Sequence, residues 1–230
     1  MQQLVSDPEY LARRAEKEAR RQQRAERIRQ AEAPFLVVLA EAGFPIPSID
    51  SIRNHFNPLP PELASLLIEW IPRLEDPGSQ QWAAWALLAM PKRSIDGRLL
   101  TPIFDTTTND ELKWALADVI DQTRPRNIED WLIVAIRDRR SGSARNLLAS
   151  AVAKMVPAER AVPVLLEVFE DVPLAAVHSL GKMGDSSVRD FLVTQQPSAT
   201  GPLRRELRQA IARIERRLAK TLRKARGAMP

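Results

Sequence analysis

The sequence of 230 residues contains no cysteine and only two histidines, His55 and His178. Disulfide bonds and thiolate metal sites are therefore excluded, and a zinc or di-iron site built on histidine is not expected. We expect no cofactor and no metal. Aromatic residues make up 5% of the chain, which favours a core of tightly packed Ala, Leu, Val and Ile over the core of a β-sandwich.

Long apolar runs are also lacking. The longest, residues 34–40, is too short to cross a bilayer as a helix. The first five residues show neither the basic region nor the apolar region of a signal peptide. We therefore expect a cytoplasmic protein that does not enter the membrane.

Motifs of conventional catalysis are absent from the sequence as well. It shows no Gly-rich phosphate loop, no Ser–His–Asp spacing and no paired-carboxylate motif. This favours a non-catalytic protein, although the sequence alone leaves enzymatic activity open.

The net charge of +5 is unevenly distributed. Residues 1–30 carry eight Lys or Arg against five Asp or Glu, and residues 203–230 carry ten against two. The middle of the chain, residues 31–202, is therefore net negative. A net negative charge argues against a region whose main role is to bind along a phosphate backbone. The basic ends leave nucleic-acid binding open as an alternative.

An apolar pattern recurs every 33 residues between positions 62 and 171. A period of this length predicts stacked repeats, each buried by its neighbours, rather than a single closed core. The columns place Trp70, Leu99 and Ile136 in the core, and Asp105, Asp138 and Asp171 recur in a loop or capping position. The three apolar columns are Leu66, Leu99, Leu132 and Leu165; Leu67, Leu100, Ile133 and Leu166; and Trp70, Ile103, Ile136 and Phe169.

Helical periodicity and capping residues divide the chain into three regions: a charged helical arm over 1–30, repeats over 31–202 and a basic capping helix over 203–230. Ser48, Asn109 and Asn127 are predicted N-caps, Ser48 for a short helix that carries Ile49 and Ile52. Gly43 is predicted to close an apolar helix over 31–43. Pro61 should open, and Pro72 should bend or end, the helix at 61–75. The later helices are expected at 79–90, 94–104, 110–122, 127–138, 143–155, 158–171, 174–183 and 186–194.

Two stretches resemble bacterial HEAT-like repeat proteins, including the subgroup named for phycobilisome-lyase-type repeats. They are Leu112–Ala117 followed by Arg139–Arg145, and Ala176–Gly184. The resemblance extends from about residue 60 to about residue 215. It implies an all-α fold, an α-solenoid of stacked antiparallel helix pairs. It implies little about function, since such arrays serve as adaptors, scaffolds, lyase subunits and DNA glycosylases.

The five tryptophans all lie between residues 70 and 131. Trp82 aligns with Ala115 in the repeat and is predicted to be core. Trp85 aligns with Asp118, and Trp131 aligns with Arg98 and Val164, so both are predicted to be partly exposed. Trp85, Trp114 and Asp118 form a candidate groove. In HEAT-like DNA glycosylases such aromatic side chains and an Asp stabilise a cationic sugar-like centre. The alternative is that Asp118 is an ordinary carboxylate at the rim of a packed helix.

The turn at 137–145 offers a second candidate site. A Gly/Ser turn that opens a helix presents backbone N–H groups, and Arg139, Arg140 and Arg145 would complete an anion site for a phosphate or a partner's carboxylate. The alternative is a solvated turn whose arginines pair with acidic neighbours such as Asp138 or Asp105.

These observations favour a scaffold or adaptor that binds a protein partner on the face formed by the second helices of the pairs. The alternative from another class is a nucleic-acid binding or processing protein that uses the basic ends and the Trp/Asp groove. A lyase-like or chaperone subunit is a third hypothesis, which rests on the resemblance alone.

Overall fold

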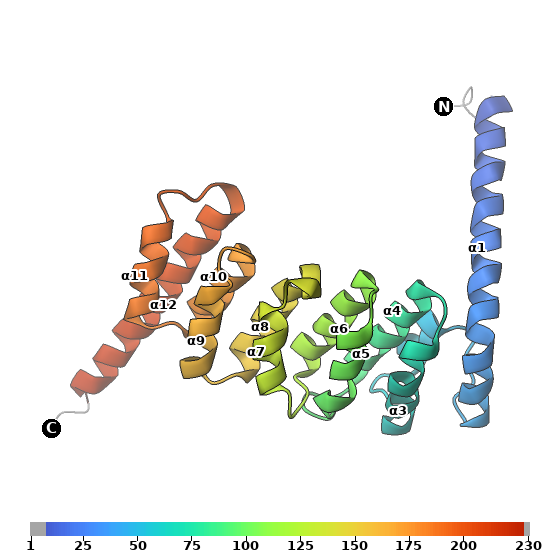
Figure 1. Cartoon of the computed structure of the whole chain (residues 1–230), viewed down its shortest axis with the longest axis horizontal. Helices are drawn as coiled ribbons and strands as arrows, with labels where there is room; N and C mark the ends of the chain where they lie inside the picture. The colour runs from blue at the N-terminus through green and yellow to red at the C-terminus, as the bar shows by residue number, and fades with distance from the viewer. Residues whose placement is uncertain (1–7, 228–230) are drawn as a thin grey trace. The chain divides into compact units, whose positions relative to one another are not determined.

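The computed structural model describes residues 8–227, and the outer parts of the two predicted terminal regions, 1–7 and 228–230, lie outside this range. The described chain is 79% helical and has no strand, and its helices pack against their neighbours in sequence (Figure 1). Backbone contacts divide the chain into two compact units, Met1–Ala89 and Met90–Pro230. The all-α fold class is thereby confirmed, and each unit is described by itself.

The first unit contains four α-helices and short 3₁₀ turns. Pro61 lies in the first turn of α3, where its missing N–H would have no helical partner. Pro72 ends the helix as predicted, because a 3₁₀ turn replaces the α-helix directly after Trp70. Asp76 caps the next helix by accepting the Ser79 N–H at 2.9 Å. The elements are α1 (Pro8–Glu41), η2 (Ile49–Ser51), α2 (Ile52–His55), α3 (Pro61–Trp70), η3 (Ile71–Arg73), α4 (Pro77–Ala86) and η4 (Leu87–Ala89).

One helix, α1, replaces the predicted charged arm and the separate apolar helix over 31–43. Pro34 lies inside α1 at an exposed position, and the helix continues past it to Glu41. The predicted end at Gly43 is confirmed. Gly43 adopts a φ of 87°, and the Phe44 N–H donates to the Leu39 carbonyl at 2.8 Å, which is the Schellman pattern.

A buried carboxylate, Glu32, joins three elements of the first unit. Its side chain lies on α1 and the residue is 3% exposed. One oxygen accepts the Ser79 hydroxyl of α4 at 2.7 Å, and the other accepts the Ile49 N–H that opens η2 at 3.1 Å. Glu32 therefore takes the capping position that the sequence suggested for Ser48, whose hydroxyl donates to Asp50 instead.

The second unit continues the helical pattern to the end of the described chain. Asn109 caps α6 as predicted, by accepting the N–H groups of Glu111 and Leu112. The prediction of Asn127 as a cap is wrong: Asn127 has a φ of 65°, and the N-cap of α7 is the next residue, Ile128. The elements are η5 (Gly97–Leu99), α5 (Thr101–Thr106), α6 (Asp110–Thr123), α7 (Glu129–Arg137), η6 (Arg139–Ala144), α8 (Arg145–Met155), α9 (Ala158–Glu167), α10 (Pro173–Met183), α11 (Ser186–Gln195) and α12 (Gly201–Gly227).

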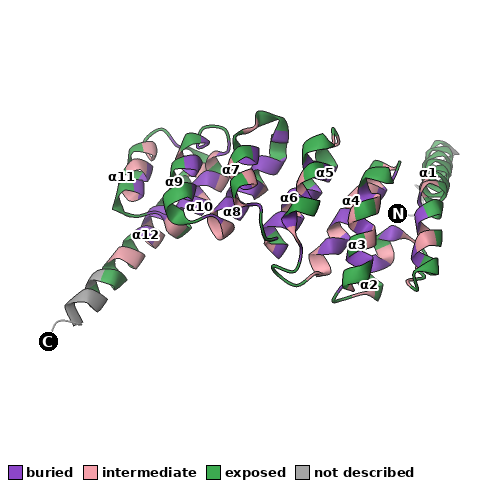
Figure 2. Ribbon diagram, turned by 60° about the horizontal axis from the view of Figure 1, so that its bottom comes forward, coloured by how far each residue is buried: buried purple, intermediate pink, exposed green. Residues whose placement is uncertain are grey.

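Small residues bring four helices of this unit close together. Helix α8 contacts α6 and α10, and α10 contacts α12. Figure 2 shows the buried faces of these helices turned towards one another. At the α10–α12 contact, a Cβ on Gly181 would lie 2.8 Å from the Cβ of Ala210. On the other side of α10, the Ser179 hydroxyl donates to the Ala149 carbonyl of α8 at 3.0 Å.

The apolar columns are only partly confirmed as core. Ile136 is fully buried, and Trp70 is half-buried with its ring stacked on Phe35 at 5.1 Å between centroids. The prediction for Leu99 is wrong, because Leu99 is 55% exposed while Leu100 is fully buried. A 3₁₀ turn over Gly97–Leu99 precedes α5 and rotates the chain, so that the inward position is one residue later than the column predicts.

No helix within the described residues is long and apolar enough to cross a bilayer.

Replacing Glu32 by Ala should destabilise the first unit. The substitution removes two hydrogen bonds and leaves the Ile49 N–H buried without its acceptor, which costs about 2–3 kcal/mol of unfolding free energy. Urea unfolding followed by circular dichroism measures this loss. Glu41→Ala, at an exposed position near the end of the same helix, should change the unfolding free energy by less than about 0.5 kcal/mol. Equal effects of the two variants would contradict the role of Glu32.

Gly181→Ala should destabilise the second unit although Ala is the better helix former by about 1 kcal/mol. The new methyl group would collide with Ala210 and force α10 and α12 apart, at a cost of about 1–3 kcal/mol. The melting temperature of the full chain is the measurement. A rise in melting temperature would contradict the close approach of the two helices.

Candidate functional site

A surface groove in the second unit has a volume of about 550 Å³ and is the candidate site. It lies between α5 and α7, with η6 and the side chain of Lys113 from α6 along its edge. Helices α5 and α7, which form its walls, correspond to the second helices of two predicted pairs, at 94–104 and 127–138. That a partner binds on these second helices stays a prediction.

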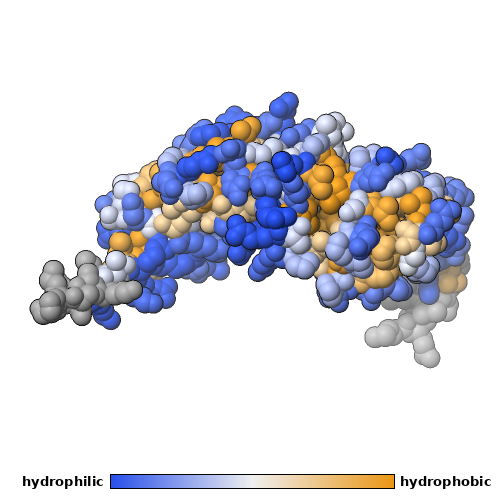
Figure 3. Space-filling model, turned by 90° about the horizontal axis from the view of Figure 1, so that it is seen from below, coloured by the Kyte–Doolittle hydropathy of each residue, from blue (hydrophilic) through white to orange (hydrophobic). Residues whose placement is uncertain are grey.

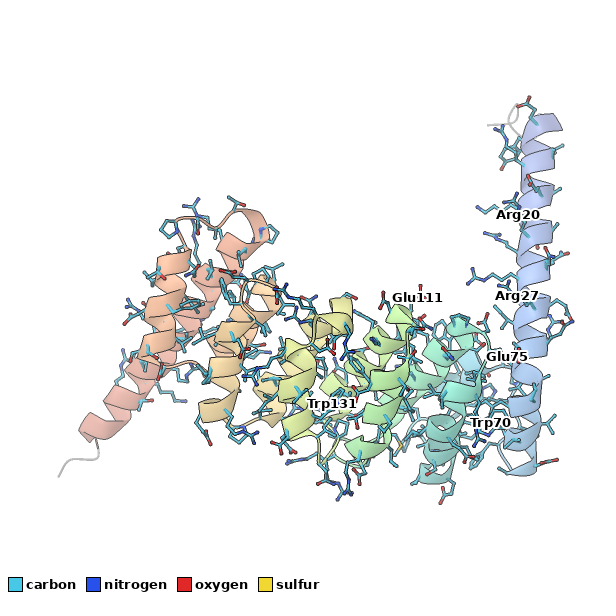
Figure 4. All side chains as sticks on the ribbon, in the orientation of Figure 1. Arg20, Arg27, Trp70, Glu75, Glu111 and Trp131 are labelled. Atoms are coloured by element: carbon cyan, nitrogen blue, oxygen red, sulfur yellow. The ribbon has the colours of Figure 1, made fainter. Side chains whose placement is uncertain are left out.

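The floor and one wall of the groove are aromatic. Phe104 of α5 is buried, and the ring of Trp131 on α7 meets it edge to face at 5.2 Å between centroids (Figure 4). The indole N–H of Trp131 donates to both carboxylate oxygens of Asp105, each at 3.1 Å. This fixes the Trp131 ring in the wall, since its apolar edge and its polar edge both have partners.

An apolar side chain, Val134, lies open in the groove. It is 65% exposed, whereas its neighbours Ala135 and Ile136 on α7 are buried. The apolar face of α7 therefore extends beyond its buried residues and leaves Val134 open to solvent. Figure 3 shows that, on the face of the molecule drawn there, apolar surface patches lie among strongly hydrophilic ones.

Charged side chains of both signs line the other edge. Asp138 accepts the Arg140 guanidinium at 2.8 Å, and Lys113 donates to the Arg140 carbonyl at 2.9 Å. Hydrogen bonds from the Arg140 side chain, and then from its backbone, lower the pKa of Asp138, and the charge of Lys113 acts in the same direction. Asp138 is thus ionised at neutral pH and is engaged in the turn, not poised as a general acid.

The structure brings two of the three predicted arginines to one carboxylate and places the third in the groove. Arg140 lines the groove, with its side chain 87% exposed. Arg145 is buried and donates to the Ile136 carbonyl at 2.7 Å and to Asp171 at 2.9 Å. Arg139 reaches the same carboxylate at 3.2 Å from the solvent side. Each arginine of this turn therefore has an acidic partner, as the alternative interpretation of the turn expected.

The recurring aspartates also differ in role. Asp138 caps η6 by accepting the Arg140 N–H, as predicted from the repeat. Asp105 instead accepts the indole of Trp131, and Asp171 accepts Arg145 and Arg139. The regular spacing located these carboxylates without revealing their partners.

The three residues of the predicted Trp/Asp groove belong to two helices. Trp85 lies on α4 in the first unit, and Trp114 and Asp118 lie one turn apart on α6 in the second. Trp114 is 37% exposed and Asp118 is half-buried. A shared groove formed by these residues stays a prediction.

Trp82 is not a core residue, contrary to the prediction. It is 43% exposed and lines a cavity of about 270 Å³ in the first unit, together with Ile28 of α1. The repeat aligned Trp82 with Ala115, which is fully buried, so the two positions of the repeat differ in burial. The prediction of partial exposure for Trp85 and Trp131 is confirmed.

Sequence reasoning missed the combination that makes the groove: Phe104, Asp105, Lys113, Trp131 and Val134. Two signals were present in the sequence. Asp105 recurs every 33 residues, and Trp131 aligns with Arg98 of the preceding repeat. Neither reveals that the two side chains, 26 residues apart, are hydrogen-bonded. Within residues 8–227, no group of three or more His, Asp or Glu side chains is placed to hold a metal ion.

Arg145→Met should destabilise the chain more than Arg139→Met. The first variant leaves the Ile136 carbonyl without its donor in a buried position, which costs about 1–3 kcal/mol, whereas Arg139 is exposed. Chemical unfolding of both variants measures the difference.

The effect of Arg145→Met should also depend on pH. The hydrogen bond and the charge of Arg145, followed by the charge of Arg139, lower the pKa of Asp171 in the folded chain. The stabilisation is therefore complete above the unfolded-state pKa of an Asp, about 4, and is lost as the pH falls through the lower folded-state pKa. The stability gap between the wild type and Arg145→Met should narrow on acidification. A gap that stayed constant from neutral pH to about pH 2 would contradict this coupling.

Comparisons of the chain with protein-family models, with curated proteins and with solved structures find no match.

Proposed function

We propose that the chain is a HEAT-like α-solenoid that acts as a non-catalytic scaffold and holds a protein partner in the groove between α5 and α7. The 33-residue spacing and the packing of each helix against its neighbours in sequence support the repeat architecture. So do the successive contacts of α6 with α8, α8 with α10, and α10 with α12.

The exposed Val134 beside the Trp131–Asp105 pair is the observation that carries the proposal. Apolar side chains that are left open in a concave site indicate a binding surface, and tryptophan is enriched at the centres of protein interfaces. Asp105 retains unused acceptor positions, because its two oxygens share a single indole N–H. The groove therefore suits a partner segment with an apolar side chain next to a Lys or Arg.

The charge of the groove favours a protein over a phosphate polymer. Its edges carry two carboxylates, Asp105 and Asp138, and two cations, Lys113 and Arg140. Arg140 is already paired with Asp138. The phosphates of a nucleic acid would be repelled by the two carboxylates and would find few unpaired cations. A protein segment can instead present charges of both signs.

Val134→Asp should abolish capture of the partner without destabilising the chain. Because Val134 is mostly exposed, the change of stability should stay within about 0.5 kcal/mol. The added charge would place an unpaired carboxylate against the apolar part of the bound segment, and the partner's affinity should fall at least about tenfold.

The measurement is quantitative mass spectrometry of proteins captured from the native host by the full chain and its variants, followed by titration with the purified partner. Val193→Asp makes the same substitution on α11, at a residue that is 39% exposed and lies outside the groove, and should leave capture unchanged. A partner that binds the wild type and both variants equally would place the binding surface elsewhere. Recovery of nucleic acid and of no protein would refute the scaffold.

A further inference from the structure

The first turns of α1 form a helix with exposed side chains on every face. All side chains from residue 10 to residue 27, here called the arm segment, are exposed, and burial of α1 begins at Ile28. The helix is nevertheless continuous from the arm segment into the first unit, where Phe35 and Leu39 are fully buried. The packed end therefore holds the arm segment in helical form, and ion pairs along it such as Glu16–Arg20, at 2.5 Å, add to this.

Cations form a straight stripe along the arm segment. Successive members are separated by four, three, four and three residues, so they lie on one face within about 80° of arc and extend over about 21 Å. Figure 4 shows Arg20 and Arg27 projecting to the same side of α1. The stripe consists of Arg13, Lys17, Arg20, Arg24 and Arg27.

Three cations of the stripe are not neutralised. Among the described residues, 8–227, Lys17, Arg24 and Arg27 make no ion pair, whereas Arg20 pairs with Glu16 and Arg13 approaches Glu9 at 3.9 Å. The arm segment as a whole carries seven Lys or Arg against three Glu. The arm segment is therefore a net positive rod; towards its packed end, Asp76 lines one cavity with Arg24 and another with Arg27.

The composition of the arm segment argues against two other occupants. A helix that lies in a membrane surface needs a broad apolar face, but apart from alanines the segment offers Tyr10 and Leu11, both at its first turn. A coiled-coil partner needs apolar residues at the four-three spacing, and here that spacing is filled by cations. The remaining partners are polyanions.

We propose that the arm segment binds B-form DNA, with the helix in the major groove and the cationic stripe on the phosphates of one strand. An exposed helix of about 10–12 Å diameter fits a groove about 12 Å wide. Six of its seven cations are arginines, which form bidentate hydrogen bonds with phosphate. The arrangement is independent of the α5–α7 groove, which lies in the other unit.

The test is fluorescence anisotropy of the full chain with a labelled DNA duplex between about 50 and 200 mM NaCl. If five phosphates are neutralised, the logarithm of the association constant should fall against the logarithm of salt concentration with a slope of about −4.5, which is a loss of about 500-fold over this range. A duplex RNA of the same sequence, whose narrow major groove does not admit a helix, should bind more weakly.

The critical variant replaces all five stripe residues by Gln: Arg13→Gln, Lys17→Gln, Arg20→Gln, Arg24→Gln and Arg27→Gln. Because these side chains are exposed, the melting temperature should change little, while DNA binding should fall more than about tenfold and most of the salt dependence should disappear. A matched control removes five exposed cations of α12: Arg204→Gln, Arg205→Gln, Arg208→Gln, Arg216→Gln and Lys220→Gln. It should retain the slope.

Three results would overturn the proposal. They are no binding of DNA at the lowest salt, equal losses in the two variants, and binding that the stripe variant retains. Poly-glutamate serves as the probe for an acidic protein partner. The stripe recognises an acidic protein and not DNA if poly-glutamate binds the wild type but not the stripe variant, and if DNA does not bind the wild type.

Discussion

The close approach of successive helices through Ala, Ser and Gly is the constraint on which the second unit depends. Gly181 lies against Ala210 without room for a methyl group, and Ser179 reaches a backbone carbonyl of the preceding helix. Such small residues allow the backbones of packed helices to approach closely. Larger apolar side chains on the same helices, among them Leu116, Leu148 and Leu180, are fully buried. Aromatic pairs lie elsewhere in the unit, where Phe104 meets Trp131 and Phe169 meets Phe191 edge to face.

The same approach lets basic side chains reach the C-terminal ends of neighbouring helices. Lys154 on α8 donates to the buried carboxylate of Asp121 on α6 at 2.6 Å, and Arg217 on α12 donates to the Lys182 carbonyl near the end of α10. Cations at these positions interact favourably with the partial negative charge of a helix C-terminus. Burial lowers the pKa of Lys182, and so, to a smaller extent, does the charge of Lys154, because the two cations lie close together. In the arm segment of α1 the cations are exposed instead.

Much of the fold could be predicted from the sequence, since helices are local structures with local signals. Asn109, Pro61, Pro72 and Gly43 start or end their helices as expected, because capping and the geometry of proline and glycine depend on a few neighbouring residues. The failures arise where distant contacts override local rules. Leu99 follows a repeat column but is turned outward by a 3₁₀ turn, and Ser48 loses its capping role to Glu32, which lies 16 residues earlier in the sequence.

The candidate site was less predictable for the same reason. A charged residue such as Arg145 looks identical in sequence whether it projects into solvent or donates to a buried carbonyl, and its burial is decided by Asp171, 26 residues away. The groove depends on pairs such as Asp105 and Trp131, which are also 26 residues apart in the sequence. No local sequence pattern indicates that two such residues are in contact. The periodic spacing indicated which residues were unusual, but the contacts that decide their chemistry exist only once the helices have packed.

Pro34 gives α1 a mechanical property beyond its role as a tolerated helix residue. Lacking an N–H, it cannot donate to the carbonyl of Gln30, so the ladder of hydrogen bonds has a gap between the exposed and the packed halves of the helix. Glu32, which hydrogen-bonds to α4 and to η2, lies within this gap. A missing hydrogen bond lowers the resistance of a helix to bending at that point. We therefore expect the exposed part of α1, some five turns long, to bend at the place where Glu32 anchors the helix.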